Sequence, residues 1–196
     1  MPESPDQSSP ISGQSEDSLH FVLMRHAKSD WSGEDVADHD RPLNSRGVRD
    51  APVMARWIAE TGFVPNYILC SSAKRTQQTA ALMESYWKHT NVPTPRLVIE
   101  PPLYLASAKT ILQTVERVSR IADEDGENFP RTVLILGHNP GISHAASMLA
   151  GHPIGLPTAA MVVYRCSTTD WSEALGHENA MMVDQMKPKL LGREHR

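Results

Sequence analysis

The sequence is poor in cysteine, in long apolar runs and in net basic charge, and each deficit excludes a class of protein. Its two cysteines, Cys70 and Cys166, form neither a disulfide framework nor a Cys-x-x-Cys pair, so we expect two inert thiols. No apolar run approaches the roughly 20 residues that a membrane helix needs. The N-terminus also lacks the basic and apolar regions of a signal peptide. We therefore expect a cytoplasmic protein that does not associate with membranes.

Acidic charge is concentrated at the start of the chain. Residues 1–18 contain four acidic residues and no Lys or Arg, and they account for the formal net charge of -4. The remaining chain is balanced, which argues against a nucleic-acid partner, so any basic patch should be local to a site. The same segment is rich in Ser and Pro and poor in apolar residues. We predict a disordered tail over residues 1–18, followed by a single domain over residues 19–196.

Apolar runs alternate with amphipathic segments along this domain. The predicted strands cover residues 21–26, 67–70, 97–99, 132–137, 159–166 and 180–186, the last of them at a sheet edge. The predicted helices cover residues 73–88 and 141–150, a segment capped by Ser107, and a first segment capped by Ser45 or, if Pro52 forces a restart, by Asp50. Residues 168–178 are polar and predicted to form a loop. The alternation predicts a three-layer α/β/α fold with a mostly parallel central sheet.

Three of the predicted strands lead into residues that suit phosphoryl transfer. Arg25 and His26 end the first strand, His138 follows the strand at 132–137, and Arg75 lies in the first helical turn after residues 67–70. Ligands of open α/β sheets collect at the carboxyl ends of the strands. Arginine forks complement phosphoryl oxygens and imidazole is a nucleophile. One strand-end histidine alone is more often structural, but the three ends together favour a phosphoryl-transfer site.

A metal centre is the alternative use for the nine histidines of this chain. No His-Glu-x-x-His motif occurs, and His138, His144 and His152 lack the i, i+4 spacing of helical metal ligands. The remaining histidines outside the candidate site are scattered, and we expect most of them to be solvated; they are His20, His39, His89, His177 and His195. The sequence therefore predicts no metal ion and no other cofactor.

Five segments, in a fixed order, resemble the histidine phosphatase superfamily. The matching segments are residues 24–29, 40–47, 71–80, 103–107 and 137–141. They span about residues 20–165, and the likeness is greatest to the small SixA-type phosphohistidine phosphatases. Many relatives have glycine where this chain has Ala27, a variation that fits the SixA-like branch. The resemblance implies a phosphoglycerate-mutase-like fold.

The resemblance also implies a role for each matching side chain. His26 would be the phosphate-accepting nucleophile, with Arg25 beside it. Arg75 and His138 would be the second arginine and the second histidine of the phosphate pocket. Arg41 would be an additional phosphate contact.

The proton donor is the part of the family pattern that this sequence does not supply. Mutase-like relatives carry a glutamate in a longer insertion, which has no clear counterpart here. Glu100 is the nearest candidate, and Asp40 and Asp30 are others. A phosphohistidine substrate demands less of a proton donor because its leaving group is an imidazole.

Three functions remain open at this point. The first is a metal-independent phosphatase that hydrolyses phosphate monoesters or phosphoramidates, above all protein phosphohistidine, through a covalent phosphohistidine on His26. The second is a non-catalytic phosphate-binding module, and the third is a small-molecule phosphatase or mutase of the same fold. Binding alone needs no nucleophile, so the first is favoured. We expect short loops and a shallow, open pocket. The partner should be a phosphate-bearing substrate, preferably a phosphohistidine protein. The sequence does not indicate the oligomeric state.

Overall fold

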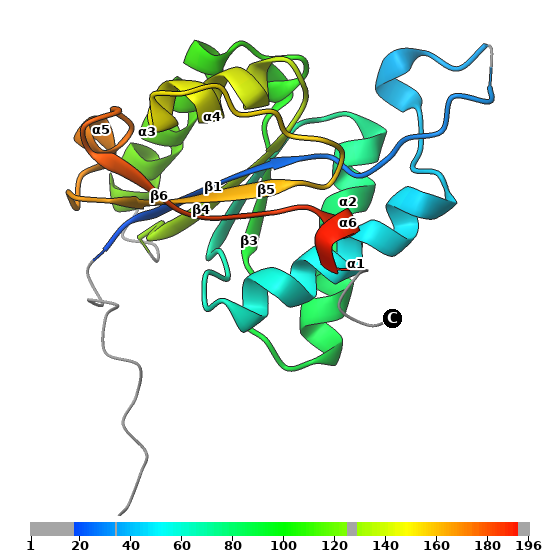
Figure 1. Cartoon of the computed structure of the whole chain (residues 1–196), viewed down its shortest axis with the longest axis horizontal. Coiled ribbons are helices and arrows are strands. Elements are labelled where there is room, and N and C mark those ends of the chain that lie inside the picture. Colours follow the sequence, from blue (N-terminus) through cyan, green and yellow to red (C-terminus); the bar gives the residue numbers. More distant parts are fainter. Residues whose placement is uncertain (1–17, 34, 125–128, 192–196) are drawn as a thin grey trace, which may run out of the picture.

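The computed structural model describes residues 18–33, 35–124 and 129–191. A six-stranded sheet runs through the molecule in the order β3-β2-β4-β1-β5-β6 (Figure 1). Its strands are β1 (His20–Arg25), β2 (Tyr67–Cys70), β3 (Arg96–Ile99), β4 (Thr132–Gly137), β5 (Met161–Cys166) and β6 (Ala180–Met186). The first four are mutually parallel, β5 is antiparallel to β1, and β6 is antiparallel to β5. The predicted mostly parallel sheet and the edge position of β6 are confirmed.

Helices cover both faces of the sheet (Figure 1). They are α1 (Ser45–Glu60), α2 (Lys74–His89), α3 (Ala108–Glu124), α4 (Gly141–Ala150), α5 (Trp171–Ala174) and α6 (Pro188–Leu191), with short 3-10 turns η1 (Asp38–Asp40) and η2 (Pro101–Leu103). Successive side chains of a strand point to opposite faces. Phe21 and Leu23 accordingly join the core under α3 and α4, whereas Val22 and Met24 join the core under α1 and α2. Two buried cores on one sheet make the predicted three-layer fold.

Three local predictions are corrected by the structure. Asn44, not Ser45 or Asp50, caps α1, because its side chain accepts a hydrogen bond from the Gly47 amide. Pro52 lies inside an unbroken α1. The carbonyl that loses its partner there belongs to Val48, which is exposed, so water can satisfy it. The segment predicted as a loop over residues 168–178 contains α5, whose Trp171 is buried.

The predicted tail at residues 1–18 lies almost entirely outside the described residues. Within the described residues, no helix is long and apolar enough to cross a membrane.

Candidate active site

The carboxyl ends of β1, β2 and β4 meet at one edge of the sheet, because β4 lies between the other two strands. The His26 amide donates to the Gly137 carbonyl at 3.1 Å, and the Ser71 amide donates to the Leu136 carbonyl at 3.1 Å. These bonds continue the strand ladders into the segments that carry the polar residues. His26, Arg75 and His138, which the sequence places far apart, are in mutual contact here.

Two glycines allow helices to approach this edge closely. A Cβ atom on Gly47, near the start of α1, would lie 2.3 Å from the Lys28 carbonyl oxygen. A Cβ atom on Gly141, the first residue of α4, would lie 1.8 Å from the Ala106 carbonyl oxygen. Any larger residue would push the backbone after His26, or the start of α4 after His138, out of place.

The hydrogen-bond partners of its two ring nitrogens hold His26 in one tautomer. Nδ1 lies 2.7 Å from the Ala27 carbonyl oxygen, which only accepts, so Nδ1 carries the proton. Nε2 then has a free lone pair, and it accepts from Nε of Arg75 at 3.3 Å. Burial lowers the pKa of His26 to about 4; the Ala27 hydrogen bond opposes this shift, and the charges of Arg75 and Arg25 add to it. The ring is neutral at neutral pH, with its nucleophilic nitrogen facing an arginine.

His138 adopts the opposite tautomer. Its Nδ1 accepts from Nη2 of Arg75 at 3.3 Å, so Nε2 carries the proton and donates to Oγ of Ser71 at 2.8 Å. Burial, followed by the neighbouring His26 and Arg75, lowers the pKa of His138 to about 3. In this state His138 presents a lone pair to the site, and it must gain a proton on Nδ1 before it can donate to a phosphoryl oxygen.

Arg75 is shared between the two histidines and Asp38, a residue of the segment between β1 and α1. Its Nη2 donates to Oδ2 of Asp38 at 2.9 Å, and its Nη1 donates to the Asp38 carbonyl oxygen. The Tyr104 hydroxyl donates to the same Oδ2 at 2.7 Å. Burial raises the pKa of Asp38, but the bonds from Tyr104 and Arg75 outweigh it, so the net pKa is lowered. A carboxylate thus occupies the guanidinium fork of Arg75.

Asp38 and Ser71 are site residues to which sequence reasoning gave no role. Asp38 lies in a polar loop where its spacing to the other motifs carries no signal. Ser71 and Tyr104 belong to two of the segments that resemble the family. That resemblance could have indicated that both residues lie at the site.

Arg25 is half-buried and directly precedes His26 in the chain. Its Nη1 donates to the Leu156 carbonyl at 3.2 Å, while its buried Nε finds no hydrogen-bond partner among the described residues. Burial and the charge of Arg75 lower the pKa of Arg25. This guanidinium retains capacity to bind an anion.

Arg41 lies apart from that group. Its guanidinium stacks over Trp31, 4.5 Å from the ring centroid, and donates to the Gly33 carbonyl at 3.1 Å. Among the described residues, Arg41 makes no hydrogen bond to His26 or Arg75. Its predicted phosphate contact stays a prediction.

The three candidate proton donors are engaged elsewhere. Glu100 is buried and pairs with Arg117 at 2.5 Å. Asp40 is exposed and contacts the adjacent His39, and Asp30 accepts from the Ser32 amide at 2.9 Å. The structure brings none of these carboxylates into contact with His26 or His138 among the residues it describes.

Comparison with known proteins assigns the chain to a family. The sequence profile of the histidine phosphatase superfamily (branch 1) matches residues 21–98. An uncharacterized chloroplastic protein of Arabidopsis thaliana is 32% identical over 80% of this chain and 71% of its own length. The chain belongs to the histidine phosphatase superfamily.

Solved members of this superfamily have the same fold. A structure from Agrobacterium tumefaciens, named as a "putative phosphohistidine phosphatase SixA", matches with a TM-score of 0.69 at 24% identity, over 87% of this chain and 98% of that one. A protein histidine phosphatase SixA complexed with tungstate matches with a TM-score of 0.68 at 21% identity, over 88% and 99%. An uncharacterized protein of Mycobacterium tuberculosis is 37% identical over 65% of this chain and 70% of its own length.

The site of this superfamily member is more enclosed than the sequence indicated. The expectation of a short loop after the first strand, and of an open pocket, is wrong: residues 26–44 connect β1 to α1 and carry Asp38 to the site. His26, Arg75 and His138 are only 6%, 4% and 2% exposed. Among the described residues, no group of three or more His, Cys, Asp or Glu side chains is arranged to hold a metal ion.

Proposed function

We propose that this chain is a metal-independent phosphatase that hydrolyses protein phosphohistidine through a covalent phosphohistidine on His26. The observation that carries the proposal is the fixed tautomer of His26. Its Nδ1 proton is bound to Ala27, which leaves the Nε2 lone pair directed at Arg75, 3.3 Å away. A neutral, oriented imidazole beside a cation is what in-line attack on an anionic phosphorus requires.

The first step transfers the phosphoryl group to the enzyme. Nε2 of His26 forms a bond to phosphorus while the bond from phosphorus to the substrate imidazole breaks, and the departing imidazole takes a proton from solvent or from a protonated His138. Arg25 and Arg75 stabilise the charge on the equatorial oxygens. Each charge-assisted hydrogen bond of this kind contributes about 1.5–3 kcal/mol.

The second step regenerates the enzyme. Water attacks the same phosphorus, the bond to Nε2 breaks, and inorganic phosphate leaves with His26 neutral again. The negative phosphoryl group favours a proton on Nδ1 of His138, which lets this ring donate to an oxygen during both steps. Asp38 must release Arg75 before either step, because both its carboxylate and its backbone carbonyl accept from that guanidinium.

The carboxyl groups around the site are poorly suited to donate a proton, which supports phosphohistidine as the substrate. Asp38 is bound by Arg75 and Tyr104, and its pKa is lowered, so it is ionised. Glu100 and Asp40, the proton donors that the sequence offered, are bound to Arg117 and His39. An imidazole leaving group departs with little help, unlike an alkoxide. The likeness to structures named as SixA phosphohistidine phosphatases supports the same substrate. The proposal includes a single domain over residues 19–196 in the cytoplasm.

A second candidate is a small-molecule phosphatase of the same fold. The near-complete burial of His26 and His138 favours it, because an enclosed site suits a small substrate. A comparison of kcat/KM for a phosphohistidine peptide, an aryl phosphate and glycerol phosphate separates the two. We expect the alkyl phosphate to be the poorest substrate; if it is the best, the second candidate holds.

The covalent intermediate provides the direct test. Brief exposure to a labelled phosphohistidine peptide should leave label on the protein that is labile in acid and stable in base. The label should be absent from His26→Ala. Acid-stable label, or label that persists in that variant, would contradict the mechanism.

A further inference from the structure

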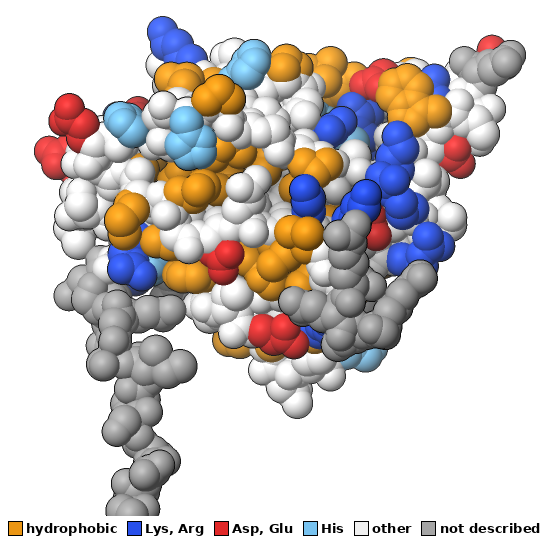
Figure 2. Space-filling model, in the orientation of Figure 1, with side chains coloured by type: hydrophobic (Ala, Val, Ile, Leu, Met, Phe, Trp, Pro, Cys, Tyr) orange, Lys and Arg blue, Asp and Glu red, His pale blue; other side chains and the backbone are white. Residues whose placement is uncertain are grey.

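A cluster of basic side chains lies on the catalytic edge of the sheet and takes no part in the site described above. Arg46, Lys187 and Lys189 line a cavity of about 450 Å³. Figure 2 shows Lys and Arg side chains gathered on this face, over the start of α1 and around α6. The chain body as a whole is balanced in charge, so such a concentration is local. We name this group of three residues the basic cluster.

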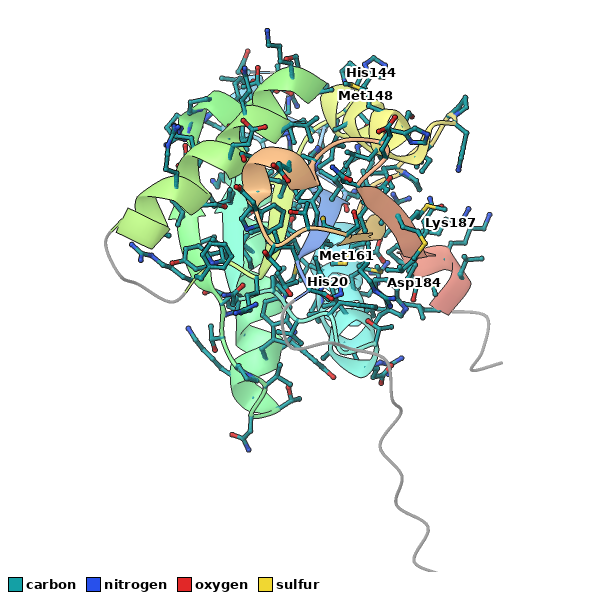
Figure 3. All side chains as sticks on the ribbon, turned by 90° about the vertical axis from the view of Figure 1, so that its left-hand side faces the viewer. His20, His144, Met148, Met161, Asp184 and Lys187 are labelled. Atoms are coloured by element: carbon teal, nitrogen blue, oxygen red, sulfur yellow. The ribbon has the colours of Figure 1, made fainter. Side chains whose placement is uncertain are left out.

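Chain direction places the basic cluster on the same edge as His26. β6 is antiparallel to β5 and β5 is antiparallel to β1, so β6 ends at the carboxyl edge of β1. Lys187 follows β6 directly and is exposed where the strand passes into α6 (Figure 3). Arg46 lies in the first turn of α1, which begins at that edge as well.

The walls of this cavity adjoin the backbone of the catalytic segment. Thr158 accepts from Nη2 of Arg46 at 2.9 Å, and the next residue, Ala159, donates its amide to the carbonyls of both Arg25 and His26 at 3.1 Å. On the other side, Gly47 follows Arg46 and packs against the Lys28 backbone. Any molecule that fills the cavity therefore lies close to the backbone of Arg25, His26 and Lys28.

The cations of the cluster are largely uncompensated. Asp50 is the one acidic residue in the lining, and it is already paired with Arg46 at 3.6 Å. Neither Lys187 nor Lys189 has a carboxylate within ion-pair distance among the residues that the structure describes. Two exposed lysines and a positioned arginine form a surface that attracts negative side chains.

We infer that the basic cluster is a docking surface for acidic residues that flank the phosphorylated residue of a protein substrate. A cavity of this size admits one or two carboxylate side chains beside a phosphorylated segment. Three cations are too few to neutralise a length of nucleic acid, whose affinity depends on many phosphate contacts. The inference rests on the proposed function, since it assumes that a phosphoprotein approaches His26.

The test uses two phosphohistidine peptides that differ only in carrying four glutamates or four serines around the phosphorylated residue. In the double variant Lys187→Glu/Lys189→Glu we expect KM for the acidic peptide to rise about tenfold, with kcat unchanged, because exposed ion pairs act on encounter and binding. The serine peptide should change less than twofold. An unchanged KM for the acidic peptide, or equal changes for both peptides, would overturn the inference.

Arg56→Glu/Lys88→Glu is the matched control. It introduces the same change of charge near the ends of α1 and α2, which lie at the opposite edge of the sheet. We expect it to leave both peptides within twofold of the parent.

Binding of the unphosphorylated acidic peptide, followed by fluorescence anisotropy, needs no turnover. Weaker binding in the lysine variant alone supports the inference even if neither phosphopeptide is hydrolysed, a result that would instead contradict the proposed function. Single-stranded DNA that binds as tightly as the acidic peptide, with the same loss in the lysine variant, would overturn the assignment to a protein.

Discussion

The two ends of β1 each carry a buried histidine, and only one of them belongs to a site. His20 begins the strand and is 7% exposed, and His26 follows its end and is 6% exposed (Figure 3 labels His20). Burial lowers the pKa of both rings. Burial and a lowered pKa therefore do not distinguish His20, outside the candidate site, from His26, within it.

Hydrogen-bond partners do distinguish them. His20 packs against Phe63, with ring centroids 5.0 Å apart, and its buried Nε2 finds no partner among the described residues. Both nitrogens of His26 are engaged, by a carbonyl and by an arginine that also reaches a second histidine. Parallel strands bring several loops together at their carboxyl ends, whereas the amino end of β1 is closed by apolar packing.

The largest effect should come from removing the cation at the catalytic end. Under the proposed mechanism Arg75 stabilises charge that develops on the phosphoryl oxygens, so Arg75→Ala should lower kcat by roughly 10²–10³-fold. Arg165→Ala, which removes the cation that acts on His20, should leave kcat within twofold. Steady-state kinetics on a phosphohistidine peptide measures both.

Arg41→Ala tests the arginine outside the contact group. It should mainly raise KM, as expected for binding that is uniform between ground and transition states. A loss of kcat equal to that of Arg75→Ala would place Arg41 on the reacting phosphoryl group and would require the segment 26–44 to rearrange.

The next effect concerns stability in acid. The folded-state pKa values of His26 and His138, about 4 and about 3, lie below the ordinary value of 6.5. The unfolded chain therefore binds more protons than the folded one. The contribution of the two neutral rings to stability is fully present above pH 6.5 and is lost as pH falls toward 4 for His26 and toward 3 for His138. At pH 5 we expect each ring to lower the free energy of unfolding by roughly 2 kcal/mol relative to neutral pH.

Urea denaturation at pH 7.5 and pH 5.0 checks this expectation. The loss of stability between the two pH values should be smaller by roughly 2 kcal/mol in His26→Gln. It should be unchanged in His89→Gln, where the ring is exposed. The same pH dependence in all three proteins would mean that His26 is not a buried neutral imidazole.

A smaller effect is expected from Asp38, which competes with phosphate for Arg75. In Asp38→Asn the ion pair with Arg75 becomes a hydrogen bond from the guanidinium to a neutral amide oxygen, which competes less well with a bound anion. Inorganic phosphate should therefore bind about tenfold more tightly, as measured by calorimetry. Tyr104→Phe, which removes the other bond to Oδ2, should shift binding in the same direction by less. Weaker phosphate binding in Asp38→Asn would instead make Asp38 a residue that positions Arg75 for the anion.

The comparison of the two strand ends also explains what the sequence could and could not predict. Apolar runs that end in Arg25 and His26, and then in His138, locate the site because strand direction carries them to one edge. The burial of His20 was not predicted, since the apolar residue that packs against it, Phe63, follows a helix more than forty residues away in sequence. Asp38 was missed for the same reason: its partners Arg75 and Tyr104 are distant in sequence, and only the folded loop joins them.

The smallest effect separates the two ends by the sign of a stability change. His20→Phe removes a buried nitrogen that has no partner among the described residues, and it keeps a ring against Phe63. We expect a gain of about 1 kcal/mol at pH 7.5, because an unsatisfied buried polar group costs about 1–3 kcal/mol. His26→Phe should instead lose stability, since the buried Ala27 carbonyl and the Arg75 guanidinium would each lose a hydrogen bond. Urea denaturation of both variants gives the two signs. A lower free energy of unfolding in His20→Phe would show that a water molecule is hydrogen-bonded to Nε2 of His20. The two ends of β1 would then not differ in how their histidines are hydrogen-bonded.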